Sequence, residues 1–177
     1  MSYTSHYNSP LGVIMLACEN DALTGVWFVG QKYFARSLPV SRQEEEQPVL
    51  VATKRWLDIY FSGHEPEFMP NILLRGSAFQ MAVWNILQGI RYGTTMTYGQ
   101  IAEQIARQRG LRRMSAQAVG GAVGHNPVGI LVPCHRVVGS NGSLTGYAGG
   151  IEKKIFLLKT EQINMSAFFV PRKGTAL

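Results

Sequence analysis

A cysteine followed directly by a histidine and an arginine is the feature of this sequence that could do chemistry. Cys134, His135 and Arg136 come after the apolar run Ile130–Val132 and Pro133. Such a run is typical of a buried strand, and proline favours extended backbone in the residue before it. Neighbouring cations lower the pKa of a thiol and raise the fraction of reactive thiolate. We therefore interpret Cys134 as a nucleophile rather than as a small buried apolar residue.

The imidazole of His135 is the candidate base for this thiol. Adjacent side chains on an extended segment point to opposite faces, so a direct hydrogen bond from Cys134 to His135 needs a turn, and otherwise a bridging water. An activated nucleophile also needs a third group that orients the base. The acidic residues of the second half are Glu103, Glu152 and Glu161, and spacing alone does not choose among them.

Neither a metal nor a cofactor is expected. Cys18 and Cys134 are 116 residues apart, and no cluster of cysteine and histidine has the spacing of zinc ligands. Two cysteines are too few for a disulfide framework, which favours a cytoplasmic location with free thiols. The longest apolar run, Val13–Cys18, is too short to cross a membrane, and the start shows no secretory signal.

The charge of the 177 residues is divided unevenly. The net charge is +6, but residues 1–75 carry −2 and residues 76–177 carry +8. No acidic residue lies within 104–151, a stretch that contains Arg112 and Arg113. A basic half beside a mildly acidic half favours a polyanionic partner such as nucleic acid. The alternative is a basic surface that serves only solubility.

The first half predicts a small sheet with a helix. Strand-like runs cover 3–7, 13–17 and 22–29, and Pro48 opens a helical pattern that continues to about Phe61. With 46% hydrophobic and 16% charged residues, the chain has the composition of a folded protein and not of a disordered one.

The second half predicts helices, and we place the domain boundary near residues 75 and 76. Ser77 with Gln80 and Thr97 with Gln100 are capping boxes before apolar helical patterns, and Ser115 begins a further helix. The last two helices and their polar loop resemble a helix-turn-helix. The fold class is therefore α+β, with a small N-terminal β-sheet and helix domain followed by a mainly helical domain.

Glycines mark two further segments. Gly120, Gly121 and Gly124 lie in the helix after Ser115, where each costs about 1 kcal/mol relative to alanine. We favour close approach of a packed backbone or a nucleic acid strand over a poor helix as their explanation. Tyr147 lies in a second glycine-rich segment, where it either forms the wall of a planar pocket or is an exposed loop residue.

Five segments of the second half follow one another in a recognisable order: Thr97–Ala102, Ala118–Ala122, Asn126–Pro127, Pro133–Val138 and Thr145–Gly150. Together they resemble the methylated-DNA–protein-cysteine methyltransferases, also called O6-alkylguanine-DNA alkyltransferases. The cysteine segment is the most specific of them. The first half is similar, more loosely, to the ribonuclease-H-like N-terminal domain of that family.

The resemblance implies a DNA repair protein. It would bind double-stranded DNA that contains O6-alkylguanine, with O4-alkylthymine as a further lesion. It would rotate the damaged base out of the stack, because a stacked base hides its reacting atom. It would then move the alkyl group irreversibly to Cys134, so that each molecule acts once. We also expect a monomer.

The resemblance assigns roles at the reacting centre. Cys134 is the nucleophile, His135 deprotonates it through a water, Glu161 orients His135, and Asn126 fixes the thiol segment.

It also assigns contacts to the base and to DNA. Tyr98 crowds the phosphate and donates to the base, Val137 offers a backbone carbonyl to the guanine amino group, and Tyr147 and Ala148 form a lid. The expected DNA contacts are Gln117, Ser140, Arg112, Arg113 and Arg136. Gln117 stands where the family often has an arginine that fills the gap left by the flipped base.

Two alternatives from other classes stay open. The first is a non-catalytic sensor of alkylated DNA, but relatives of that kind lack the cysteine. The second is a helix-turn-helix regulator with a buried cysteine, which leaves the residues around Cys134 and the glycine-rich lid unexplained.

Overall fold

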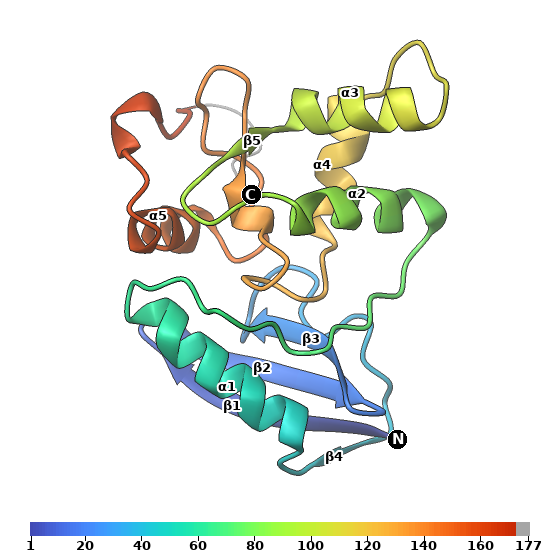
Figure 1. Cartoon of the computed structure of the whole chain (residues 1–177), viewed down its shortest axis with the longest axis vertical. Coiled ribbons are helices and arrows are strands. Elements are labelled where there is room, and N and C mark those ends of the chain that lie inside the picture. The colour runs from blue at the N-terminus through green and yellow to red at the C-terminus, as the bar shows by residue number, and fades with distance from the viewer. Residues whose placement is uncertain (173–177) are drawn as a thin grey trace. The chain divides into compact units, whose positions relative to one another are not determined.

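The computed structural model describes residues 1–172, which form two compact units (Figure 1). The first unit consists of Met1–Leu74 with Pro127–Leu131, and the second of Arg75–Asn126 with the residues from Val132 onward. No helix in the described part of the chain is both long enough and apolar enough to span a bilayer.

The first unit is a four-stranded sheet with a helix across one face (Figure 1). β1 (Ser2–Ser9), β2 (Gly12–Glu19) and β3 (Ala22–Phe28) are antiparallel neighbours, and the short β4 (Arg42–Glu44) runs parallel to β1. α1 (Pro48–Phe61) packs against the first three strands. The three strands and the helix confirm the pattern of the sequence, whereas β4 was not expected.

Local chemistry explains these elements. Asn20 and Asp21 both have positive φ, at 47° and 59°, as a two-residue type I′ hairpin turn requires. Pro48 occupies the start of α1, where a backbone N–H has no helical partner in any case. Leu50, Leu57 and the other residues of one helix face are buried against the sheet.

A distant segment pairs with the edge of β3. Val26 donates its N–H to the carbonyl of Pro127 at 2.9 Å and accepts from the N–H of Gly129 at 3.1 Å. These two bonds explain why Pro127–Leu131 groups with the first unit, which a single boundary near residue 75 does not capture.

The run Ile130–Val132 is buried but is not a strand. It forms a turn in which Ile130 has a φ of 69°. The predicted strand is therefore wrong, because a short apolar run shows burial without showing which backbone conformation is buried.

The second unit is mainly helical. α2 (Ala78–Gln88), α3 (Tyr98–Gln108) and α4 (Ala116–Gly124) pack against one another, and α5 (Ile151–Thr160) contacts the 3₁₀ helix Cys134–Arg136. Both capping boxes form, and the Ser115 side chain caps α4, as predicted. α5 was not expected from the sequence.

A short parallel ladder joins the helix-turn-helix to the cysteine segment. β5 (Met96–Thr97) pairs with β6 (Val137–Val138). β5 leads directly into α3, and β6 follows the 3₁₀ helix directly. The ladder therefore holds the start of α3 beside the residues that follow the candidate nucleophile.

Candidate active site

Cys134 begins the 3₁₀ helix and is 6% exposed. Its Sγ accepts a hydrogen bond from Nδ2 of Asn126 at 3.2 Å, and the same amide donates to the carbonyl of Val132 at 2.7 Å. Asn126 thus ties the sulfur to the backbone just before it, at the place where the sequence predicted it.

The 3₁₀ geometry corrects the extended conformation expected for this segment. Successive side chains of a 3₁₀ helix are about 120° apart. Cys134 and His135 consequently still point in different directions, and proton transfer between them still requires a relay.

Glu161 gathers the polar groups around the histidine. Its Oε1 lies 2.5 Å from Nε2 of His135 and 3.1 Å from Nη2 of Arg136. Its Oε2 accepts from Nε of Arg136 at 2.8 Å and from the N–H of Gly93 at 3.1 Å. The structure thus brings together the residues predicted as base and orienting acid, while Glu103 and Glu152 lie on exposed helix faces.

These contacts set the charges of the cluster. Burial acts to raise the pKa of Glu161, but the bonds and charges of His135 and Arg136 outweigh it and lower the pKa to about 2. Burial lowers the pKa of His135, against the opposing pull of Glu161. His135 is therefore a neutral base beside a charged carboxylate.

The thiol is not activated by its sequence neighbours. Burial raises the pKa of Cys134, and this outweighs the bond from Asn126 and the charge of Lys154, which both lower it. The expectation of a lowered pKa is wrong, because Arg136 is paired with Glu161 and His135 is neutral. At neutral pH the sulfur carries its proton and needs a base.

Arg136 faces the interior and not the solvent. It is 8% exposed, and besides Glu161 its Nη1 donates to the carbonyl of Ile90 at 2.5 Å. A guanidinium with these buried partners is not available to phosphates. The prediction that Arg136 contacts DNA is therefore wrong, because its guanidinium is buried and already paired.

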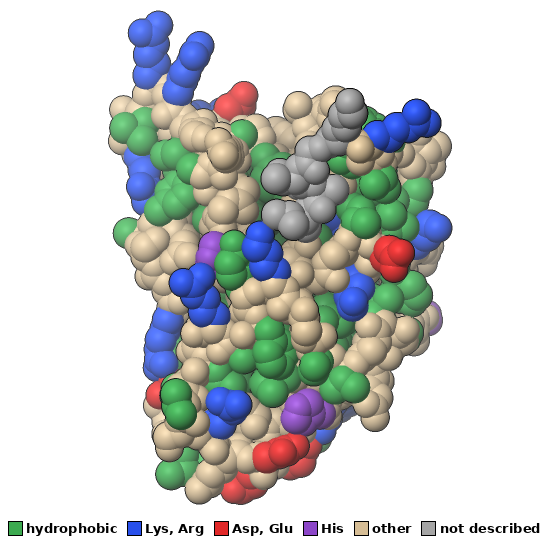
Figure 2. Space-filling model, turned by 180° about the vertical axis from the view of Figure 1, so that it is seen from behind, with side chains coloured by type: hydrophobic (Ala, Val, Ile, Leu, Met, Phe, Trp, Pro, Cys, Tyr) green, Lys and Arg blue, Asp and Glu red, His purple; other side chains and the backbone are tan. Residues whose placement is uncertain are grey.

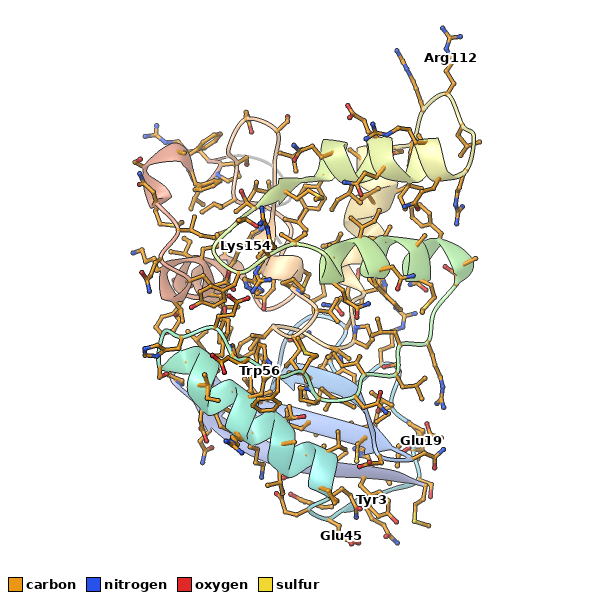
Figure 3. All side chains as sticks on the ribbon, in the orientation of Figure 1. Tyr3, Glu19, Glu45, Trp56, Arg112 and Lys154 are labelled. Carbon is orange, nitrogen blue, oxygen red and sulfur yellow. The ribbon has the colours of Figure 1, made fainter. Side chains whose placement is uncertain are left out.

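Lys154 is a buried residue of the site that the sequence reasoning missed (Figure 3). Its Nζ donates to the carbonyl of Val137 at 2.5 Å and to that of Thr145 at 2.7 Å. The signal was present, because Lys154 stands three and four residues before Leu157 and Leu158, on the apolar face of α5.

Tyr98 anchors the glycine-rich segment. Its hydroxyl donates to the carbonyls of Thr145, at 3.0 Å, and Gly146, at 3.1 Å. A Cβ on Gly146 would lie 2.5 Å from that hydroxyl, and the φ of Gly146 is 74°, so glycine is required here. Tyr147 is 4% exposed, which excludes the exposed alternative, and Ala148 is half-buried beside it.

The outer face of α4 consists of small side chains and one glutamine. Ala116, Gln117, Ala118 and Gly121 are exposed. A Cβ on Gly121 would meet no atom within 4 Å, and a Cβ on Gly120 would make only an ordinary contact with the Tyr98 ring at 3.8 Å. The fold itself therefore does not require glycine at position 121.

Basic side chains stand out from the turn before α4. Arg112 and Arg113 are exposed, and Arg112 projects away from α3 and α4 (Figure 3). The space-filling view shows neighbouring basic side chains projecting at the corresponding edge (Figure 2). Ser140, the remaining predicted DNA contact, is exposed in a separate turn.

No group of three or more His, Cys, Asp or Glu side chains within residues 1–172 could hold a metal ion.

Comparisons with known proteins identify the family. The family model described as "6-O-methylguanine DNA methyltransferase, ribonuclease-like domain" matches residues 2–72, and the one for the "DNA binding domain" matches residues 78–163. The methylated-DNA–protein-cysteine methyltransferase of Haemophilus influenzae is 39% identical over 163 residues, covering 91% of this chain and 87% of that protein. The Methanosarcina acetivorans protein of the same name is 42% identical over 160 residues, covering 90% and 97%.

A solved structure is similar over the same length. The crystal structure of Mycobacterium tuberculosis OGT in complex with DNA has a TM-score of 0.76 and 38% identity, and 94% of each chain is covered. The chain belongs to the 6-O-methylguanine DNA methyltransferase family.

The Glu161 cluster predicts a pH-dependent stability. Glu161→Gln is expected to lower the free energy of unfolding at pH 7 by about 3 kcal/mol, because it leaves the buried Arg136 without a counter-charge. The folded-state pKa of Glu161, about 2, lies below the ordinary value of 4.5, so its stabilisation is present above pH 4.5 and lost as pH falls through 2. The difference from the wild type, measured by urea unfolding, should shrink over that window.

Glu152→Gln is the matched control, because Glu152 lies exposed on α5. Its effect should stay below about 1 kcal/mol at every pH. Equal losses in the two variants would contradict the structural role of Glu161.

Proposed function

We propose that this chain is a single-turnover DNA repair methyltransferase that takes the alkyl group from O6 of guanine in double-stranded DNA onto its own Cys134. The observation that carries this proposal is a buried thiol, bonded to Asn126, beside the pair of His135 and Glu161 in the unit that contains the helix-turn-helix. The name of the curated relatives, methylated-DNA–protein-cysteine methyltransferase, supports the same reaction.

The geometry supports a defined path for the proton. Because Nε2 of His135 is bonded to Glu161, the other ring nitrogen, Nδ1, is the one to take the proton of Cys134 through a water. The thiolate then attacks the alkyl carbon, a carbon–sulfur bond forms, and the electrons of the broken carbon–oxygen bond return to guanine. The guanine anion takes up one proton, and His135 gives up the one it received, so both groups end neutral. Water does not hydrolyse the thioether, so each molecule reacts once.

The flipped base would lie against the segments that surround the thiol. Val137 and Cys134 offer backbone carbonyls to the guanine amino group, and Tyr147 and Ala148 cover the ring. Tyr98 already donates to Thr145 and Gly146, which supports a role in shaping this lid beside its predicted contacts with phosphate and base.

The DNA partner would meet α4 and the turn before it. Small exposed side chains on α4 allow a groove to approach the helix backbone, and Arg112 and Arg113 supply phosphate contacts. Gln117 would enter the stack after flipping, with Ser140 as an additional contact. Neither a sensor nor a regulator needs the buried relay at His135, which favours the transferase. We expect a monomeric protein of the cytoplasm.

Covalent transfer is the direct test. Incubation with a duplex containing O6-methylguanine should add about 14 Da to the intact protein, the mass of one methyl group exchanged for a proton, because a single nucleophile is consumed. Peptide mapping by mass spectrometry should find the methyl group on Cys134 and none on Cys18, which is buried in β2. An unmodified Cys134 in folded protein with excess substrate would sink the proposal.

Substitution of Gly121 is expected to change DNA binding and protein stability in opposite directions. Gly121→Ala should raise the free energy of unfolding by up to about 1 kcal/mol, because alanine is the better helix former and no protein atom opposes its Cβ. The same change should weaken binding to duplex DNA, measured by fluorescence anisotropy. Reaction with the free O6-alkylguanine base should keep its rate. Unchanged DNA affinity would remove the close-approach interpretation of this glycine.

Gln117 tests the flipping step. Gln117→Ala should slow repair of the duplex much more than reaction with the free base, because only the duplex reaction requires flipping. Gln117→Arg should tighten duplex binding and steepen its salt dependence, because it adds one cation beside phosphates. If Gln117→Ala slows both reactions equally, or neither, Gln117 does not serve flipping.

A further inference from the structure

Ile130 has a backbone conformation that its residue type rarely adopts. Its φ is 69°, and among the non-glycine residues of positive φ within residues 1–172 it alone is buried. The N–H of Leu131 donates to the carbonyl of Gly129 at 2.9 Å, which closes a three-residue turn around Ile130. A positive φ at the centre of such a turn is that of the classic γ-turn, which is rare and strained. A strained residue of this kind persists only where the surrounding structure fixes its backbone.

The backbone before the γ-turn is fixed on the edge of β3. Val26 donates to the carbonyl of Pro127 at 2.9 Å and accepts from the N–H of Gly129 at 3.1 Å. A Cβ on Gly129 would lie 3.2 Å from the carbonyl oxygen of Val26, so the segment lies tightly against the strand. The side chain of Ile130 is itself 1% exposed. Backbone bonds on one side and burial of the side chain therefore hold Ile130 in its strained conformation.

The backbone after the γ-turn leads directly to the thiol. Pro133 has φ −82° and ψ 64°, and the N–H of Cys134 donates to the carbonyl of Val132 at 2.8 Å, which is an inverse γ-turn. The Val132 carbonyl also accepts from Nδ2 of Asn126 at 2.7 Å, and the same amide donates to Sγ of Cys134. Because Val132 comes two residues after Ile130, a change in the Ile130 backbone moves the carbonyl to which these groups are bonded.

Relaxation of the strained turn would displace the thiol. A change of φ from 69° to the ordinary negative region redirects the chain that follows Ile130. Because Pro127 and Gly129 are bonded to Val26, the displacement falls on the residues between Ile130 and Cys134. The bond of 3.2 Å between the amide of Asn126 and the sulfur would then be lost.

We propose that Ile130 is a positioning residue for the nucleophile, because its strained γ-turn sets the direction in which the chain continues from the edge of β3 to Cys134. The inference rests on the proposed function only in taking Cys134 as the nucleophile. It assigns Ile130 no contact with the base or the alkyl group. Ile130 acts through the backbone, by keeping the sulfur at its bond with Asn126. A residue with a Cβ also has fewer backbone alternatives than glycine, which adopts both signs of φ readily.

The test compares Ile130→Ala with Ile130→Gly in the full-length protein. Both variants lose the branched side chain, and they differ in the freedom of the backbone. Because φ is positive, Ile130→Gly should unfold at a urea concentration equal to or above that of Ile130→Ala. Its limiting rate of methyl transfer from a duplex with O6-methylguanine should still be about tenfold lower, because a small misplacement of a reacting group is costly. Duplex affinity, measured by fluorescence anisotropy, should be the same in both variants.

Leu131 provides the matched control, because it is buried and its φ is not positive. Leu131→Gly should unfold at a lower urea concentration than Leu131→Ala, which is the order opposite to that expected at position 130.

A second readout uses no DNA. Iodoacetamide should modify Cys134 faster in Ile130→Gly than in Ile130→Ala, because a thiol released from Asn126 is more accessible to a small reagent. Peptide mapping by mass spectrometry separates Cys134 from Cys18. A variant that was merely less stable would not combine unchanged stability with faster modification of the thiol and slower methyl transfer.

The stability order and the iodoacetamide difference are both required, and the absence of either overturns the positioning role. Methyl transfer by Ile130→Gly at the rate of Ile130→Ala overturns it as well. If a wild-type protein transfers no methyl group while both other results hold, the proposed function fails and the role of Ile130 stands.

Gly129→Ala carries the test if neither variant at position 130 folds. It keeps the Ile130 side chain and presses a Cβ against the Val26 carbonyl, which displaces the bonded segment. It should speed the iodoacetamide reaction of Cys134 and slow methyl transfer. Wild-type rates of both reactions in Gly129→Ala would overturn the proposal.

Discussion

One buried carboxylate holds the chemical end of the second unit together. Glu161 accepts four hydrogen bonds from three residues, which come from the connection after α2 and from the 3₁₀ helix, while Glu161 itself ends α5. Because those donors offset its desolvation, the carboxylate stays charged in the interior. The residue proposed to orient the base thus also joins three segments through its hydrogen bonds, so a substitution at this position is expected to affect both chemistry and fold.

Burial shifts the pKa values of Cys134 and His135 in opposite directions. It raises the pKa of Cys134 and lowers that of His135, so both groups are neutral at rest. A protonated sulfur is protected from unintended electrophiles, which suits an acceptor that is consumed in one reaction. The neutral thiol must therefore lose its proton at the moment of attack, which is the task proposed for the relay through His135.

α4, the helix proposed to meet DNA, shows a different balance between stability and function. Glycine in a helix interior lowers stability, and at Gly121 no atom of the protein requires it. The reason proposed for this glycine is therefore a partner that approaches the helix backbone. Arg112 and Arg113 are exposed in the segment before α4, where arginines contribute little to the core and are proposed to bind phosphates.

The sequence by itself determined the features that are decided within a few residues. The start of α1 at Pro48 and the helix caps each depend on neighbours along the chain, and they lie where the sequence predicts them. Only the tertiary structure decided the rest. The burial of Arg136 depends on Glu161, 25 residues away, and the partners of Lys154 lie 9 and 17 residues away. In a sequence, a charged side chain is expected to be exposed to solvent. It can be buried when a distant segment supplies a counter-charge or carbonyl acceptors, and only folding brings that segment near.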